Sequence, residues 1–158
     1  MNFTPNNIFQ IPSIILIVFL FSCGGSTKKT NDSKFAPPVE ITYEQAIEDW
    51  ENNPGIGPVT KIQLGVLNKK LAKTGDEIYQ EKCTACHAPD KEKLGPAPEG
   101  VMNRRTPEWI MNMILNPVEM ATNDPIAKGL FKKYNTIMTD QKLTEEDARA
   151  VLEYFRTL

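Results

Sequence analysis

The pentapeptide Cys-Thr-Ala-Cys-His at residues 83–87 decides how the rest of this chain is interpreted. Two cysteines three positions apart lie on one face of a helical turn, and the histidine follows directly after the second cysteine. This spacing is typical of covalent haem attachment, in which the two thiols add to the vinyl groups of the haem and the imidazole binds the iron. We therefore predict that Cys83 and Cys86 hold one haem c and that His87 is an axial iron ligand.

Two other kinds of site use paired cysteines, and the surrounding sequence argues against both. A redox-active dithiol expects a strand before the motif and a helix after it. Here a helical pattern precedes the motif, and residues 89–98 contain three prolines and a glycine. A structural zinc site needs two further ligands, and the whole chain has one histidine and three cysteines.

The composition predicts one small domain with short attachments. The chain has 158 residues, of which 41% are hydrophobic and 24% charged, and its net charge is −2. A protein built to hold nucleic acid would carry a strong basic excess, so we predict no nucleic-acid partner. The charged fraction also argues against disorder of the whole chain. With three cysteines, a framework of two or more disulfides is excluded.

The N-terminus has the pattern of a targeting signal over residues 1–22. This stretch has no charged side chain, and its apolar run at 14–21 is too short to span a bilayer. The run leads into Leu-Phe-Ser-Cys-Gly-Gly at residues 20–25, which resembles the lipobox of bacterial lipoprotein signals. The resemblance implies that Cys23 is acylated and anchors the protein to a periplasm-facing membrane surface. The alternative is an ordinary secretory signal, or an uncleaved anchor with an incidental cysteine.

The remaining chain divides into a tether, an extension and a helical domain. Residues 23–38 are small and polar and end in two prolines, as in a flexible tether. The extension, 39–70, begins with a short helix capped by Thr42 and then becomes extended. The domain, 71–158, is predicted to be all-α. Its helix starts are expected at a Thr74/Glu77 capping box and at Thr106-Pro107, Asp124-Pro125 and Thr144.

From residue 71 to the C-terminus the chain resembles a class I c-type cytochrome. Gly75 and Tyr79 precede the pentad at the positions where the first and last helices cross in proteins of that family. Tyr154 lies in the predicted last helix. The resemblance implies a cytochrome c fold, with helices wrapped around one covalent haem. It also makes Tyr154 the expected contact of Gly75 and Tyr79.

The resemblance further implies how the iron is held. A Gly-Pro segment after the pentad, here Gly95-Pro96, supplies a proline carbonyl that accepts a hydrogen bond from the axial histidine. The sixth ligand must be a methionine, because no second histidine exists. The family takes this ligand from the loop before the last helix, which matches Met138, although Thr139 stands where the family usually has proline. Met120, in the predicted connection after the Pro107 helix, is the alternative.

Three residues are candidates for binding the haem propionates. Trp109 together with Arg104 or Arg105 can donate hydrogen bonds to these carboxylates, which need partners when they are partly buried. The alternative is that Trp109 packs in the core and that the arginines lie on a solvated face.

A fully coordinated iron predicts one-electron transfer, because no position is open for oxygen or peroxide. The alternatives are a haem-based redox enzyme or ligand sensor with a labile sixth ligand, and a structural lipoprotein with a silent pentad. Several segments, among them residues 104–120 and 143–158, resemble lipoprotein cytochromes that accompany nitrous oxide reductase in Bacteroidetes-type bacteria. This implies a quinol-side donor and a terminal reductase, such as nitrous oxide reductase, as partners. Five lysines are expected to steer an acidic partner: Lys82, Lys91, Lys93, Lys132 and Lys133.

Overall fold

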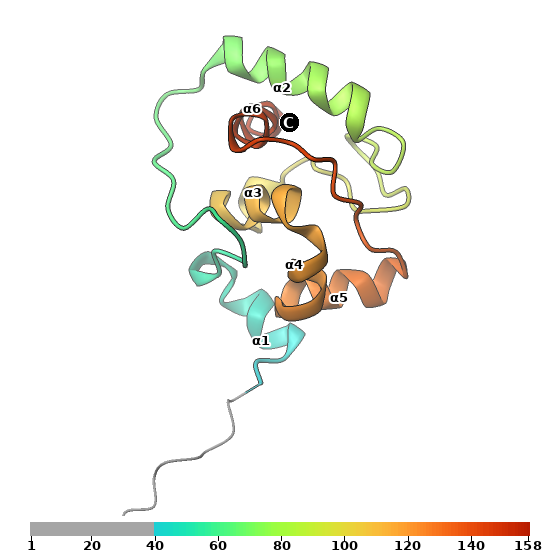
Figure 1. The fold of residues 1–158 in the computed structure, drawn as a ribbon. Helices are drawn as coiled ribbons and strands as arrows, with labels where there is room; N and C mark the ends of the chain where they lie inside the picture. The colour runs from blue at the N-terminus through green and yellow to red at the C-terminus, as the bar shows by residue number, and fades with distance from the viewer. Residues whose placement is uncertain (1–39) are drawn as a thin grey trace, which may run out of the picture. The chain divides into compact units, whose positions relative to one another are not determined.

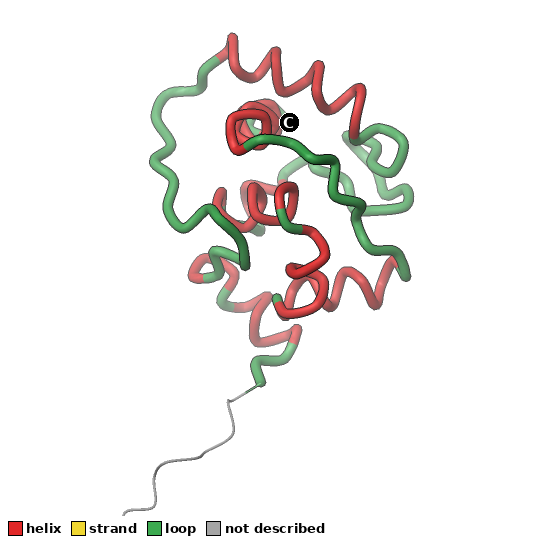
Figure 2. Tube along the Cα trace, viewed as in Figure 1, coloured by secondary structure: helices red, strands yellow, loops and turns green. Residues whose placement is uncertain are grey.

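The computed structural model describes residues 40–158, which are helical with connecting loops and contain no strand (Figures 1 and 2). The all-α prediction is confirmed for this part of the chain. The predicted signal, the tether and Cys23 lie outside the described residues. No helix of the described part has the length and apolar character needed to cross a membrane. The α-helices are α1 (Tyr43–Glu48), α2 (Lys69–Lys82), α3 (Pro107–Leu115), α4 (Pro117–Asn123), α5 (Pro125–Tyr134) and α6 (Glu145–Phe155), and short 3-10 turns occupy Trp50–Asn52 and Val101–Asn103.

Helix α2 crosses the last helix, α6, at one end of the molecule (Figure 1). Gly75 makes this crossing possible, since a Cβ atom at that position would lie 1.9 Å from the carbonyl oxygen of Ala150. Beside it, the ring of Tyr79 lies 5.2 Å from that of Tyr154 and 5.8 Å from that of Phe155. The predicted crossing and the pairing of the two tyrosines are confirmed, with Ala150 rather than Tyr154 against Gly75.

Capping residues set most helix starts where the sequence predicts them. Thr42, Thr106, Asp124 and Thr144 each accept a hydrogen bond from a backbone N–H of the first turn. The predicted start of α2 is wrong. Asn68 caps this helix by accepting from the N–H of Leu71, so α2 begins earlier and Thr74 lies within it. The hydroxyl of Thr74 instead donates to the carbonyl of Lys70, at 3.4 Å.

The segment between α1 and α2 is held against α3 by a buried side-chain amide and a half-buried carboxylate. Asn112, which is 1% exposed, accepts from the N–H of Val59 and donates to the carbonyls of Pro54 and Val59, at 2.8–3.0 Å. Glu108 accepts from the N–H of Ile62, at 2.7 Å. These bonds satisfy backbone groups that no helix or sheet satisfies. Residues 54–62 therefore form a strap along α3.

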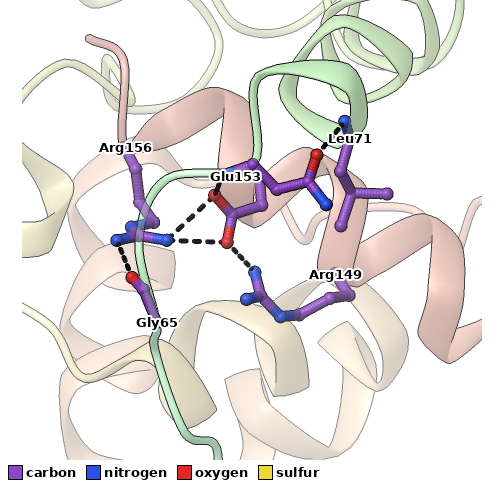
Figure 3. Close-up of polar contacts among 6 residues, drawn as sticks. Gly65, Leu71, Arg149, Glu153 and Arg156 are labelled. Carbon is purple, nitrogen blue, oxygen red and sulfur yellow. Dashed lines mark hydrogen bonds and ion pairs between the residues drawn. The ribbon is translucent and has the colours of Figure 1, made fainter.

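The end of this segment is bound to α6 through a buried carboxylate (Figure 3). Glu153 has no exposed surface and accepts hydrogen bonds from Arg156 and from the N–H of Asn68. Arg149 forms an ion pair with the same carboxylate, and Arg156 also donates to the carbonyl of Gly65. Burial by itself raises the pKa of Glu153, but the hydrogen bonds from Arg149, Asn68 and Arg156 together hold that pKa below its usual value.

Candidate functional site

The pentad begins at the C-terminal end of α2, which places its cysteines and histidine in a tight turn. The N–H groups of Cys86 and His87 both donate to the carbonyl of Cys83, at 3.0 and 2.9 Å. The hydroxyl of Tyr79 donates to the carbonyl of His87 at 3.0 Å. Burial, with a smaller contribution from the neighbouring Cys83, raises the pKa of Tyr79 to about 12, so this donor stays protonated at physiological pH.

The ring of His87 is held by the carbonyl of Pro96, which was predicted for that role, and by packing against Gly95. Its Nδ1 atom lies 2.8 Å from the carbonyl oxygen of Pro96. A carbonyl can only accept, so Nδ1 carries a proton in this contact, and Nε2 is the ring nitrogen that can bind a metal. Gly95 packs against the ring, and a Cβ atom there would lie 2.4 Å from Cε1 of His87. The arrangement orients the imidazole as a metal ligand.

The ring adjoins two cavities that share seven of their lining residues. One cavity extends between α2, α3 and α6 and is lined mainly by apolar side chains, such as Ile110, Val151 and Phe155. The other lies against α5 and the loop before α6. The shared residues are Cys83, His87, Pro96, Trp109, Met113, Leu130 and Met138.

Both cavities are lined by Met138, whereas Met120 lines neither. Met120 is completely buried, and its sulfur accepts the N–H of Ile56 at 2.9 Å. It lies in α4, where the sequence predicts a connection instead of a helix. Of the two methionines weighed from the sequence, only Met138 is therefore placed with His87. Met113, in α3, also lines both cavities.

The two thiols lie beside the same space. Cys83 lines both cavities, and Cys86 lines the second and is exposed. Burial, and to a lesser degree the neighbouring Cys86, raises the pKa of the Cys83 thiol to about 11. A redox-active dithiol needs a thiol of lowered pKa, because the thiolate is the reactive form. The surroundings of Cys83 therefore argue against the dithiol alternative.

Trp109 differs from Arg104 and Arg105 in how well its contacts fit the predicted binding of the haem propionates. The indole N–H of Trp109 donates to Asp124 at 3.0 Å, in favour of the packing alternative. Arg104 donates to the carbonyls of Ala97 and Glu99, at 2.6 and 2.8 Å. Arg105 is 7% exposed, and its guanidinium lies 5.2 Å from the centre of the Trp109 ring. Both arginines line the first cavity, so neither lies on a fully solvated face.

These side chains have the chemistry that a covalently bound haem requires. The cavities offer apolar walls for the porphyrin, two thiols at one edge, an imidazole nitrogen and a thioether sulfur. Arg105 forms no ion pair with any residue in the range 40–158, and a buried cation of this kind suits a propionate carboxylate. Within that range no cluster of three or more His, Cys, Asp or Glu side chains forms a metal site.

Comparison with known proteins agrees with this geometry. Residues 72–158 match the family described as Cytochrome c. Cytochrome c from Rhodothermus marinus is 45% identical, with a TM-score of 0.63 over 64% of this chain and 88% of that one. An engineered form of the same protein is 44% identical, with a TM-score of 0.62 and coverages of 64% and 89%. No curated protein matches the sequence. The chain therefore belongs to the cytochrome c family of haem-based electron carriers and carries covalently attached haem c, for which Cys83 and Cys86 have the required spacing.

Proposed function

We propose that this cytochrome c is a one-electron carrier whose iron is held by His87 and Met138. The observation that carries the proposal is that the Pro96-oriented imidazole and the thioether of Met138 line the same cavities. Haem supplies reversible one-electron chemistry, and a thioether ligand raises its reduction potential. With haem bound, His87 and Met138 would hold the iron and leave no position open to other ligands, and the apolar walls of the cavities would keep water away from it.

The visible absorption spectrum of the purified protein tests this function. We expect a haem that stays with the denatured chain after acidic acetone, and bands that do not change when carbon monoxide or cyanide is added. Cys83→Ser and Cys86→Ser should each loosen the covalent attachment. A spectrum that changes readily with cyanide or carbon monoxide would contradict the electron-carrier function. A purified chain without haem would favour a structural lipoprotein whose pentad binds no haem.

A ligand-binding function is the second candidate, and the loop that carries Met138 favours it. Between residues 136 and 143 the side chains and backbone form hydrogen bonds only within the loop, such as those of Lys142 with Asp140. Asn135, just before the loop, and Lys142, within it, have left-handed φ values of 50° and 57°. An engineered Rhodothermus marinus cytochrome c of similar fold, 43% identical with a TM-score of 0.60, is described as bound to a carbene intermediate. Rapid carbon monoxide binding by the reduced protein would decide for this candidate.

The proposed location is a periplasm-facing membrane surface, with an acyl anchor on Cys23. The lipobox-like sequence at residues 20–25 supports this location. Two or three acyl chains would hold the protein firmly, because each buried methylene contributes about 0.8 kcal/mol. Mass spectrometry of the mature N-terminus should show a lipid-modified cysteine. Cys23→Ala should release the protein from the membrane fraction. A mature protein that begins at another residue and carries no lipid would contradict the acyl anchor.

The proposed partners are a quinol-side electron donor and a terminal reductase, with nitrous oxide reductase as the candidate acceptor. The sequence resemblance at residues 104–120 and 143–158 supports this pairing. Stopped-flow mixing of the reduced protein with candidate reductases tests it. We expect nitrous oxide reductase to oxidise the reduced protein fast. If other reductases oxidise it faster, nitrous oxide reductase is not the acceptor.

A further inference from the structure

Asp124 is a buried carboxylate that has no part in the function proposed above. Only 1% of its surface is exposed, and it lines neither cavity. Its Oδ1 atom accepts hydrogen bonds from the indole N–H of Trp109, at 3.0 Å, and from the backbone N–H of Ala127, at 2.8 Å. Its Oδ2 atom accepts from the side-chain amide of Asn53, at 2.7 Å. All three donors are N–H groups, so both oxygens act as acceptors, as those of an ionised carboxylate do.

The hydrogen bonds of Asp124 stand in for a counter-charge. Within residues 40–158 this carboxylate forms no ion pair, and a buried charge is costly unless hydrogen bonds satisfy it. One of the donors, Asn53, precedes the residues that match the cytochrome c family. Asn53 is itself held, because its Oδ1 atom accepts the N–H of Gly55 at 2.8 Å and its backbone carbonyl accepts the hydroxyl of Thr106 at 2.6 Å. The segment before the family domain therefore helps to stabilise a negative charge at position 124.

This carboxylate lies behind the wall of the two cavities. Trp109 lines both cavities, and Ala127 lines the second. Arg105 lines the first cavity, and burial lowers the pKa of its guanidinium, whereas the negative charge of Asp124 acts in the opposite direction. The charge of Asp124 thus reaches groups that border the haem site. Because the indole N–H of Trp109 donates to Asp124, Trp109 connects the cavities with a buried carboxylate.

We propose that Asp124 is a positioning residue of the haem site, which fixes Trp109 at the cavity wall and lowers the reduction potential through its negative charge. This inference rests on the proposed electron-carrier function. On reduction, one electron enters the haem from an external donor, and no bond forms or breaks. The oxidised haem carries one more positive charge than the reduced haem, so a buried negative charge nearby favours the oxidised form. Asp124 thereby opposes the thioether of Met138, which raises the potential.

Redox titration of the holoprotein with a mediator, at fixed pH and salt, tests this role. Asp124→Asn removes the charge but keeps a side-chain oxygen that can accept from Trp109 and cap α5, since asparagine is as good an N-cap as aspartate. We expect the electron-transfer equilibrium with the mediator to move about tenfold toward the reduced protein, which is a rise of about 59 mV in the potential. Asp124→Ser is also uncharged and also a good N-cap, and it should shift the potential in the same direction.

Two control variants separate the charge of Asp124 from its packing. Asp49→Asn removes the same charge from an exposed position that lines neither cavity. Water and salt screen that charge, so the equilibrium should change by less than about twofold. Asn53→Ala removes a hydrogen-bond donor but leaves the charge of Asp124 in place, so it should not raise the potential.

The unmodified holoprotein offers a further readout by NMR. The indole N–H of Trp109 should exchange slowly with solvent, because the side chain is 4% exposed and donates to a buried carboxylate. Should neither uncharged variant hold haem, this exchange decides, because free exchange would show that Asp124 does not hold Trp109.

The inference is overturned if the uncharged variants bind haem with an unchanged or lowered potential. It is also overturned if Asn53→Ala raises the potential as much as Asp124→Asn does, since loosened packing would then explain both. Rapid carbon monoxide binding by the reduced holoprotein would instead contradict the proposed electron-carrier function, whatever the potentials of the variants.

Discussion

At the residue scale, the identity of the sixth ligand depends on where each methionine sulfur lies. The sulfur of Met120 already accepts a backbone N–H inside the core, whereas Met138 lines the same cavities as His87. A thioether bound to oxidised iron gives a weak near-infrared band. Met138→Ala should abolish that band and lower the reduction potential, since the thioether ligand that raises this potential is lost. Near-infrared absorption and redox titration of the holoprotein measure both effects.

The control for this substitution is Met120, the alternative ligand weighed from the sequence. Met120→Leu should keep the band, because the substitution conserves volume in the core and leaves Met138 in place. If the band persists in Met138→Ala, then Met113, which also lines both cavities, is the ligand.

Single residues also show what the sequence can predict about the site. The pentad and the Gly95-Pro96 pair were identified because their chemistry is local, with partners only nine residues apart. The hydrogen bond between Trp109 and Asp124 could not be predicted, because helical periodicity places an indole on an inner face without naming its acceptor. Glu153 was missed for a similar reason. Arg149 and Arg156, four positions before and three after Glu153, could have indicated its ion pairs, since charges at these spacings meet on one face of a helix.

At the element scale, the crossing of α2 and α6 depends on the absence of a side chain at position 75. A methyl group there would lie 1.9 Å from the carbonyl oxygen of Ala150, so the helices must separate. Gly75→Ala should lower the free energy of unfolding by about 2 kcal/mol, although alanine is otherwise the better helix former. Urea unfolding of the holoprotein measures this. Gly65→Ala is the control, because nothing lies within 4 Å of its added Cβ atom. An equal loss in both variants would contradict the packing argument.

The strap of residues 54–62 depends on one side chain of α3. Asn112 forms three hydrogen bonds with backbone groups of the strap. Asn112→Ala should lower the free energy of unfolding by about 3 kcal/mol, because it leaves several buried polar groups without a partner. Hydrogen exchange of the Val59 amide should also become much faster. Asn123→Ala, at the exposed end of α4, is the control and should change neither quantity. Unchanged protection of Val59 would mean that the strap is held by other contacts.

Helices were easier to predict than their limits. Thr106-Pro107 and Asp124-Pro125 combine a capping oxygen with a proline suited to the first helical turn, and both helices start there. Thr74 and Glu77 also have capping-box spacing, but Asn68 caps the helix earlier and the apolar face of α2 continues across Thr74. Helix α4 was not predicted because Asn116, which ends α3, is also its N-cap. In the sequence, two helices that share a boundary residue give the same pattern as one helix followed by a loop.

At the scale of the whole molecule, Glu153 connects the segment before α2 to the last helix (Figure 3). Its pKa in the folded protein is below the ordinary value of 4.5, so folding favours the ionised carboxylate. This stabilisation is fully present above pH 4.5 and is lost as the pH falls through the lowered pKa. Glu153→Gln should lower the free energy of unfolding at pH 7 by about 3 kcal/mol, because two arginines lose their counter-charge. The difference from the unmodified protein should shrink below about pH 4.5.

Urea unfolding at several pH values measures this dependence. Glu77→Gln is the matched control, since Glu77 is an exposed glutamate on α2 with no side-chain partner within residues 40–158. It should have little effect at any pH. A constant difference between Glu153→Gln and the unmodified protein across this range would show that the charge of Glu153 does not matter.

The pairing of α2 with α6 has a consequence for the order of biosynthesis. A chain is made from its N-terminus, so the pentad at the end of α2 emerges before residues 145–155, the helix on which α2 packs. While residues 88–144 follow, both thiols and the imidazole belong to an open chain that an attachment enzyme can reach. The order of synthesis thus allows haem to be added before the C-terminal helix closes over the site. A chain truncated before α6 should accept haem but fail to enclose it.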